Sequence, residues 1–260
     1  MQASLKPLSG MRILITRPES EAPALAGKLR ELGAKALFLP TIAILPPENT
    51  DEVDRAVRGV GEFDWVVFTS VNGVRFFYER AKALNVSIDK LNRVKVAAIG
   101  PATADALERL GRKPDYVPDE YLSEKIAQGL GDVGGKRILL PRADIASKKL
   151  PSLLIQRGAI VDEVVAYRTV IPNDLTPDRL KQIFAEGVDM ITFTSPSTVR
   201  NFLRAAGAAE LERLLKSIKV ACIGPVTVQA AKELGVRVDV VALNHTIDGL
   251  VEAIENENEN

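Results

Sequence analysis

The sequence predicts an α/β protein of two similar domains, each built on a parallel sheet that helices cover on both faces. The first of three supporting observations is an internal repeat. Residues 63–77 return as residues 188–202 at an offset of 125, with 7 of 15 positions identical. Residues 94–111 return as residues 218–235 at an offset of 124, with 10 of 18 identical. A repeat of this length indicates a duplicated domain rather than a solenoid of short units.

Short β-branched runs are the second observation. Most of them are continuously apolar rather than alternating, as expected for parallel strands covered on both faces. In chain order we expect strands at Arg12–Thr16, Lys35–Leu39, Trp65–Thr69, Lys95–Ile99, Asp115–Val117, Arg137–Pro141, Ile160–Val165, Met190–Thr194, Lys219–Ile223 and Asp239–Val241. The repeat divides these runs equally, which predicts about five strands in each domain.

Helical stretches between the strands are the third observation. The clearest helices are expected at Ala22–Leu32, Val71–Leu84 and Ala102–Leu110. Glycine, which tolerates positive φ just past a helix, stands at the matching places Gly33, Gly111, Gly158 and Gly235. Strands that alternate with helices in this way predict doubly wound parallel sheets.

Two Pro-bounded extended segments, residues 40–47 and 166–172, interrupt the alternation at equivalent positions of the repeat. We interpret them as crossings between the domains. Two crossings predict one discontinuous domain, residues 1–40 with residues 172–260, and one continuous domain, residues 45–166. The repeat is equally compatible with two sequential halves, since both arrangements contain the same units.

Composition argues against several classes of function. Lys+Arg and Asp+Glu number 34 each, so no overall field favours nucleic acid or a membrane. Cys222 is the single cysteine and His245 the single histidine. We therefore expect no internal disulfide, no metal site and a buried structural role for Cys222. No long apolar run or signal peptide is present, so a cytoplasmic protein is expected. Residues 255–260 are low-complexity and are expected to fray.

Hydroxyl and glycine motifs at the predicted strand ends indicate a ligand site. Ser70 and Ser195 come directly after strands and before helices, and Gly224 with Thr227 forms a Gly-Pro-x-Thr motif that also begins at Gly100. Open α/β sheets bind ligands at this edge, where helix N-termini favour anions. Helix capping explains Ser or Thr at these positions equally well. Both interpretations stay open.

Three further side chains are candidates for chemistry. Arg17 and Arg142 end equivalent strands, where a guanidinium suits carboxylates or phosphates, although either can be an ordinary surface residue. Tyr167 lies in the second crossing, and Ala43 occupies the corresponding place in the first. A phenol there either packs against its neighbours or donates a proton to a leaving group.

These segments together resemble the uroporphyrinogen-III synthase family. The resemblance rests on ILITRP, FTSVNGV, FTSPSTV, the paired IGPxT motifs and AYRT, and it extends from Arg12 to Ile254. It implies two flavodoxin-like domains joined by a two-stranded linker ladder, with a cleft between them and one domain discontinuous. It also implies a cytosolic monomer without cofactor. Such an enzyme cyclises the linear tetrapyrrole hydroxymethylbilane to uroporphyrinogen III, with loss of water and inversion of ring D.

The resemblance also implies roles for individual residues. Tyr167 matches the family's tyrosine in this crossing and is the expected proton donor. The residues expected to contact substrate carboxylates are Thr16, Arg17, Ser70, Asn72, Arg142, Ser195, Ser197, Gly224 and Thr227. Two other classes of protein compete with this interpretation. One is a non-enzymatic two-domain binder of a small anionic ligand or sugar, and the other is a nucleotide-sugar transferase.

Overall fold

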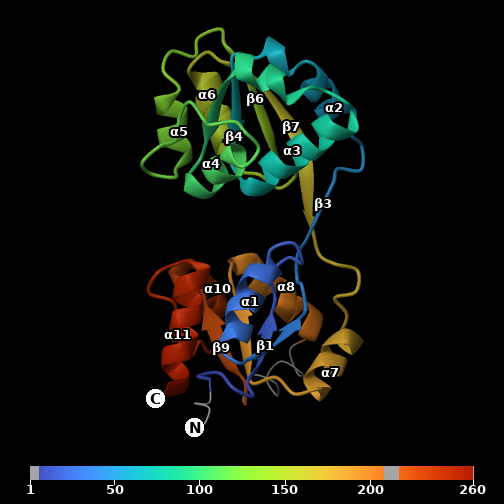
Figure 1. Ribbon diagram of the computed structural model, residues 1–260, viewed down its shortest axis with the longest axis vertical. Helices are drawn as coiled ribbons and strands as arrows, with labels where there is room; N and C mark the ends of the chain where they lie inside the picture. The colour runs from blue at the N-terminus through green and yellow to red at the C-terminus, as the bar shows by residue number, and fades with distance from the viewer. Residues whose placement is uncertain (1–5, 208–216, 260) are drawn as a thin grey trace. The chain divides into compact units, whose positions relative to one another are not determined.

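The computed structural model describes residues 6–207 and 217–259 and divides into two compact units (Figure 1). Unit 1 consists of Met1–Ala43 together with Val170–Asn260, and unit 2 consists of Ile44–Thr169. Each unit contains one five-stranded sheet with helices on both faces. The predicted α/β fold class is therefore confirmed.

The sheet of unit 1 has the strand order β10-β9-β8-β1-β2, and its strand pairs are parallel. Its strands are β1 (Arg12–Ile15), β2 (Lys35–Phe38), β8 (Met190–Phe193), β9 (Lys219–Cys222) and β10 (Val240–Val241). One face is covered by α7 (Pro177–Ala185), α8 (Pro196–Ala206) and α10 (Pro225–Glu233), and the other by α1 (Ala22–Glu31) and α11 (Ile247–Glu259). Leu14 faces the first group of helices, whereas Ile13 and Ile15 face the second. Burial on both faces explains why the strands are continuously apolar.

The sheet of unit 2 has the order β3-β7-β6-β4-β5. Its strands are β3 (Ala43–Leu45), β4 (Trp65–Phe68), β5 (Lys95–Ala98), β6 (Arg137–Ala143) and β7 (Ile160–Val170). One face packs against α2 (Asp51–Arg58), α3 (Val71–Ala83) and α4 (Pro101–Glu108), and the other against α5 (Ser123–Gly129) and α6 (Lys149–Gln156). Val66 and Phe68 point to the first face, Trp65 and Val67 to the second. Two short 3₁₀ helices, η1 (Val60–Glu62) and η2 (Ile88–Arg93), complete the unit.

Each sheet combines strands from both copies of the repeat. In unit 1, β1 and β2 of the first copy join β8, β9 and β10 of the second. In unit 2, β4 and β5 of the first copy join β6 and β7 of the second. Numbered along the chain, the unit 1 sheet has the 2-1-3-4-5 order of flavodoxin-like sheets, whereas the unit 2 sheet has the order 1-5-4-2-3. As a result, Ser70 of the first copy and Arg142 of the second belong to the same sheet, that of unit 2. In unit 1, Arg17 of the first copy and Ser195 of the second likewise follow strands of one sheet.

Two predicted segments differ in the structure. Asp115–Val117 is not a full strand, because only Tyr116 bridges to the sheet, opposite Ala97. The prediction that the C-terminal tail frays was wrong as far as the described residues reach, since α11 continues through it. Asn258 donates a hydrogen bond to the Pro7 carbonyl at 2.6 Å, and Lys219 pairs with Glu257 at 2.8 Å. These polar contacts anchor a segment whose composition alone suggested disorder.

Asp54 of α2 is a buried acid, 8% exposed, and it forms an ion pair with Arg80 of α3. The Arg80 guanidinium donates from Nη2 to Asp54 Oδ2 at 2.6 Å and from Nε to Oδ1. These hydrogen bonds outweigh the effect of burial and lower the pKa of Asp54. The ion pair thus stabilises the fold above the pKa of an unfolded Asp, and the stabilisation is lost as the pH falls through the lower folded pKa.

We therefore expect Asp54→Asn to reduce the free energy of unfolding at neutral pH more than at about pH 3, which lies below the pKa of about 3.9 of an unfolded Asp, so that the stabilisation is already partly lost there. Urea denaturation of both proteins at the two pH values measures this difference. An equal loss at both pH values would contradict a role for the charge.

Candidate functional site

Ser70 and Tyr167 form a hydrogen-bonded pair at the carboxyl end of the unit 2 sheet. Ser70 follows β4 and is the N-cap of α3, and Tyr167 lies near the end of β7. Their hydroxyl oxygens are 3.0 Å apart, and the Gly73 backbone N–H donates to Ser70 Oγ at 2.9 Å. Two residues that are 97 positions apart in the sequence, both predicted as site residues, are thus brought into direct contact.

The ring of Tyr167 is fixed by its surroundings. It is 8% exposed and stacks on Phe76 of α3, with ring centroids 5.7 Å apart and an interplanar angle of 16°. Its backbone pairs with Ala143 where the register of β6 and β7 shifts, and its carbonyl accepts from the Asp144 N–H at 3.0 Å. A bulge of this kind re-aims side chains. Sequence reasoning missed Phe76, because nothing in the linear pattern connects it to the crossing.

Arg142 is a buried, ion-paired residue. Its side chain is 7% exposed, and Nη1 donates to Glu163 Oε1 at 3.1 Å and to the Ser147 carbonyl at 2.9 Å. Arg142 Nε is buried and has no hydrogen-bond partner among the described residues. The guanidinium is therefore neutralised by Glu163, a residue that the sequence did not single out.

Asn72 lies in the first turn of α3, beside the Ser70 cap. Its side chain is partly buried, and Oδ1 accepts from Arg75 Nη2 at 3.4 Å. At the next residue, a Cβ on Gly73 would stand 2.9 Å from the Pro141 carbonyl oxygen. Glycine at position 73 thus lets the start of α3 approach the end of β6 closely.

In unit 1, the hydroxyl groups nearest the strand ends make internal bonds. Thr16 is fully buried, and its Oγ1 donates to the Thr192 carbonyl at 2.7 Å. Thr192 in turn donates to the Leu14 carbonyl at 3.1 Å, and Thr41 donates to the Thr16 carbonyl at 3.1 Å. The Thr16 side chain therefore links the end of β1 to β8. Only the backbone of Thr16 is left to contact a ligand.

Ser195 and Ser197 stand at the start of α8. Ser195 Oγ accepts from the Thr198 N–H at 3.2 Å, and Thr198 Oγ1 accepts from the Ser195 N–H at 3.3 Å, which completes a capping box. The Ser195 and Ser197 hydroxyls are 3.0 Å apart. The capping interpretation is therefore correct for both Ser70 and Ser195, and it leaves the ligand interpretation open.

Arg17 follows β1 and is partly engaged. Nη2 pairs with Glu21 at 2.7 Å, while Nε is buried with no hydrogen-bond partner among the described residues. A buried donor without a partner carries a cost that a bound carboxylate would remove. An anionic group that accepted a hydrogen bond from Arg17 Nε would remove this cost.

Gly224 and Gly100 begin equivalent helices, each beneath an aromatic ring. A Cβ on Gly224 would lie 2.8 Å from His245 Cδ2, and one on Gly100 would lie 3.0 Å from Tyr121 Cδ1. Thr227, in the first turn after Gly224, is 3% exposed. Tyr121 and His245 are 124 positions apart, which is the offset of the Gly-Pro motifs themselves. Extending the repeat alignment would have found both rings.

Cys222 is a structural residue of β9. It is fully buried, and burial raises the pKa of its thiol to about 12. A thiol in this state carries almost no nucleophilic thiolate at neutral pH. We expect a disulfide reagent such as 5,5′-dithiobis(2-nitrobenzoate) to leave Cys222 unmodified in the native protein and to react once urea unfolds it. Rapid reaction of the native protein would contradict this assignment.

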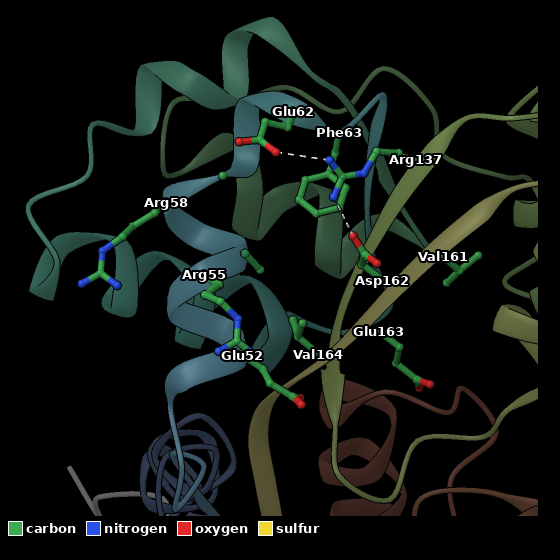
Figure 2. A pocket seen from close by; sticks show the side chains of 12 residues that line it. Glu52, Arg55, Arg58, Glu62, Phe63, Arg137, Val161, Asp162, Glu163 and Val164 are labelled. Carbon is green, nitrogen blue, oxygen red and sulfur yellow. Dashed lines mark hydrogen bonds and ion pairs between the residues drawn. The ribbon is translucent and has the colours of Figure 1, made fainter.

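A polar cavity in unit 2, of about 760 Å³, is lined by Glu163, the partner of Arg142, but by none of the predicted site residues (Figure 2). It adjoins α2, η1 and the first half of β7. Arg137 donates to Glu62 at 3.2 Å and to Asp162 at 3.0 Å, as the dashed lines of Figure 2 show. Arg137 is thus ion-paired in the cavity wall, where Arg55 and Arg58 also lie.

Residues 6–207 and 217–259 contain no cluster of three or more His, Cys, Asp or Glu placed to bind a metal ion. No helix in the same ranges is both long and apolar enough to span a membrane.

Comparisons with known proteins identify the family. The model of the family described as uroporphyrinogen-III synthase HemD matches residues 23–252. Uroporphyrinogen-III synthase of Synechococcus elongatus is 33% identical over 255 residues, which cover 96% of each chain. The porphyrin biosynthesis protein HemD of Ruminiclostridium josui is 32% identical over 251 residues, 96% of this chain and 49% of that protein.

A solved structure shows the same fold. The crystal structure of a mutant uroporphyrinogen III synthase from the extremely thermophilic bacterium Thermus thermophilus matches with a TM-score of 0.67 and 23% identity, covering 96% of this chain and 99% of that one. The family match favours the synthase over the non-enzymatic binder and the transferase. The chain belongs to the uroporphyrinogen-III synthase family, whose members are cyclising lyases of tetrapyrrole biosynthesis.

Proposed function

We propose that this protein cyclises hydroxymethylbilane to uroporphyrinogen III, with loss of water and inversion of ring D. The observation that carries the proposal is the family match over residues 23–252. The hydrogen-bonded Ser70–Tyr167 pair at a strand end supplies a candidate for the acid that this reaction needs.

The reaction begins with loss of the ring A hydroxyl group. The pyrrole nitrogen of ring A supplies the electron pair that expels the hydroxyl group. A proton donated to the hydroxyl oxygen lets this group leave as water. The resulting azafulvene is attacked by the substituted carbon of ring D, which gives a spiro-pyrrolenine. Fragmentation and reclosure then invert that ring. Holding the two ends of the linear substrate together supplies much of the rate enhancement.

Tyr167 is the proposed acid for the departure of water. A phenol hydroxyl can donate its proton to a leaving oxygen. Because Ser70 Oγ accepts from the Gly73 N–H, the serine proton is free to point at Tyr167. In that orientation the tyrosine proton faces the leaving group, and the serine stabilises the phenolate that forms.

Each unit, taken by itself, offers groups that are proposed to contact substrate carboxylates. Arg17 is proposed to donate from its buried Nε. Ser197 and Asn72 are proposed to contact carboxylates through their side chains, which are partly buried and lie in first helical turns. Ser70, Ser195 and Gly224 contribute helix N-termini, which favour anions. Thr16 and Arg142 have buried side chains, so their backbone N–H groups are the proposed donors. Thr227 is also buried, and its N–H donates to the Gly224 carbonyl at 3.1 Å, so its proposed role is to hold the start of α10 that faces the carboxylate.

The product isomer is the decisive assay. Hydroxymethylbilane cyclises unaided to the uninverted type I isomer, so an active synthase must yield type III. Incubation of the purified protein with hydroxymethylbilane, followed by oxidation and chromatographic separation of the isomers, tests this directly. Formation of type I alone, at the uncatalysed rate, would overturn the proposal.

We also propose that the protein acts as a cytoplasmic monomer. A single cysteine, buried in β9, fits a reducing compartment in which disulfides are rare. Light scattering coupled to size-exclusion chromatography should give a mass near 28.2 kDa. A mass near twice that value would contradict the monomer.

A further inference from the structure

The outer edge of β7 in unit 2 is open along the first half of the strand. β7 has eleven residues, Ile160–Val170, and lies between β3 and β6 in its sheet. β3 has only three residues, and its Ile44 packs in one cluster with Tyr167, in the second half of β7. Arg168 also donates to the Pro46 carbonyl, just beyond β3. In the part of the chain that the structure describes, no strand therefore covers the outer edge of β7 before this point.

The parallel register shows which backbone groups this edge presents. The Ile160 N–H donates to the Lys136 carbonyl at 2.8 Å, so the backbone groups of Ile160 point toward β6. Backbone groups of successive residues in a strand point to opposite edges, so those of Val161 and Glu163 point outward. Each of these two residues therefore offers an N–H and a carbonyl to a further strand. Proteins that bind extended peptides by strand addition use such an edge.

The polar cavity of Figure 2 lies beside this edge. Residues 161–164 of β7 line one part of it, and Arg55 and Arg58 of α2 line another. An added strand would run about 4.8 Å from β7, with alternate side chains on the same side. The cavity therefore provides room for the side chains that an added strand would direct toward α2.

The charges of the cavity favour an acidic ligand. Three of the four acids that line it are ion-paired: Glu62, Asp162 and Glu163. Arg55 and Arg58 are exposed and form no ion pair with any described residue, and the same holds for the fourth acid, Glu52. The unpaired groups thus carry one net positive charge, which attracts carboxylates and repels a second set of cations.

The spacing of the two free cations matches that of a strand. Arg55 and Arg58 are three positions apart on α2, which is about 4.5 Å along a helix axis. Side chains at alternate positions of a strand are about 6.8 Å apart. Because arginine side chains are long, two acids at alternate positions of an added strand can each reach one guanidinium.

We propose that this edge binds a partner protein through an extended segment with acids at two alternate positions. The segment adds to the sheet as a strand and exchanges backbone hydrogen bonds with Val161 and Glu163. Its two carboxylates pair with Arg55 and Arg58. This surface belongs to unit 2 alone and includes none of the residues proposed to contact the substrate.

NMR titration of the ¹⁵N-labelled full chain with synthetic pentapeptides tests this proposal. We expect acetyl-TEVET-amide to shift the amide signals of β7 and α2 with a dissociation constant of about 1 mM. The basic counterpart, acetyl-TKVKT-amide, should bind about tenfold more weakly or worse. Two N-methylated forms of the acidic peptide block the two alternate sets of backbone N–H groups. Only one form should keep its affinity, because only one set faces β7.

Three outcomes would overturn the proposal. The first is the absence of saturable shifts with the acidic peptide. The second is equal affinity for the acidic and basic peptides, or for both N-methylated forms, since binding would then not depend on charge or on strand pairing. The third is broadening of the β7 signals as the protein alone is concentrated, because a second copy of the chain would then occupy the edge.

Variants of the chain locate the interaction. Arg55→Glu should weaken binding of acetyl-TEVET-amide about tenfold or more. Arg109→Glu, the same change at an exposed arginine outside the cavity lining, should not. Val161→Pro removes one outward N–H, which an edge strand tolerates, and should weaken binding about fivefold. Unchanged affinity in both Arg55→Glu and Val161→Pro would contradict the assignment. The titration involves no turnover, so its failure and the failure of the proposed reaction are separate results.

Discussion

Replacing Tyr167 with phenylalanine is expected to lower kcat for uroporphyrinogen III formation by about 100-fold or more, the usual contribution of a positioned general acid. Phenylalanine keeps the ring that stacks on Phe76 and removes only the hydroxyl that lies 3.0 Å from Ser70 Oγ. The loss should therefore appear in kcat more than in the melting temperature. Isomer-resolved chromatography of the products measures it, because uncatalysed cyclisation yields type I.

A matched control is available in the same unit. The Tyr116 hydroxyl donates a hydrogen bond to the Lys125 carbonyl at 3.2 Å. Tyr116→Phe therefore removes a comparable group and should turn over like the wild type. Ser70→Ala should lower the rate less than Tyr167→Phe and should also cost about 1 kcal/mol of stability as a lost helix cap. Wild-type kcat in Tyr167→Phe would remove this residue from the mechanism.

Removal of Glu163 is expected to destabilise the fold by about 3 kcal/mol, because it leaves the Arg142 guanidinium buried without its counter-charge. The Arg142 side chain is 7% exposed and that of Glu163 is 22% exposed, so water can compensate only in part. Urea denaturation of Glu163→Ala and of the wild type gives the difference in the free energy of unfolding.

Lys148 supplies the control for this ion pair. It meets the same carboxylate at 2.7 Å, but its side chain is 77% exposed. An exposed pair of this kind contributes about 1 kcal/mol at most. Lys148→Ala should therefore have a small effect. Equal losses in the two variants would mean that burial of Arg142 does not determine the energetics.

Local elements of this fold were accessible from the sequence for simple reasons. Strands buried on both faces leave continuous apolar runs, and β1, β4, β8 and β9 were found within one residue of their ends. The tail was misjudged, because the hydrogen bond from Asn258 to Pro7 spans 251 positions and leaves no local pattern. The true extent of β7 was also missed, since strand pairing continues through a segment that looked like a linker.

The candidate site was only partly accessible. The repeat identified Ser70 and Ser195, and asymmetry between its copies identified Tyr167. The contact between Ser70 and Tyr167 could not be inferred, because it depends on strands from different copies sharing one sheet. Glu163 was missed for the same reason. It is an ordinary acid in the sequence, and only the register of β6 and β7 places it beside Arg142.

The sequence by itself determined the duplicated units, the alternation of strands and helices, and the family, since these depend on local periodicity and on motifs kept in order. The tertiary structure decided which half of each copy joins which sheet. It also decided whether a polar side chain is hydrogen-bonded within the protein or available to a ligand. Those outcomes depend on strand pairing between residues as distant in the sequence as Ile13 and Met190 or Trp65 and Ile138. Such pairing is selected by the burial of whole sheet faces rather than by any local signal.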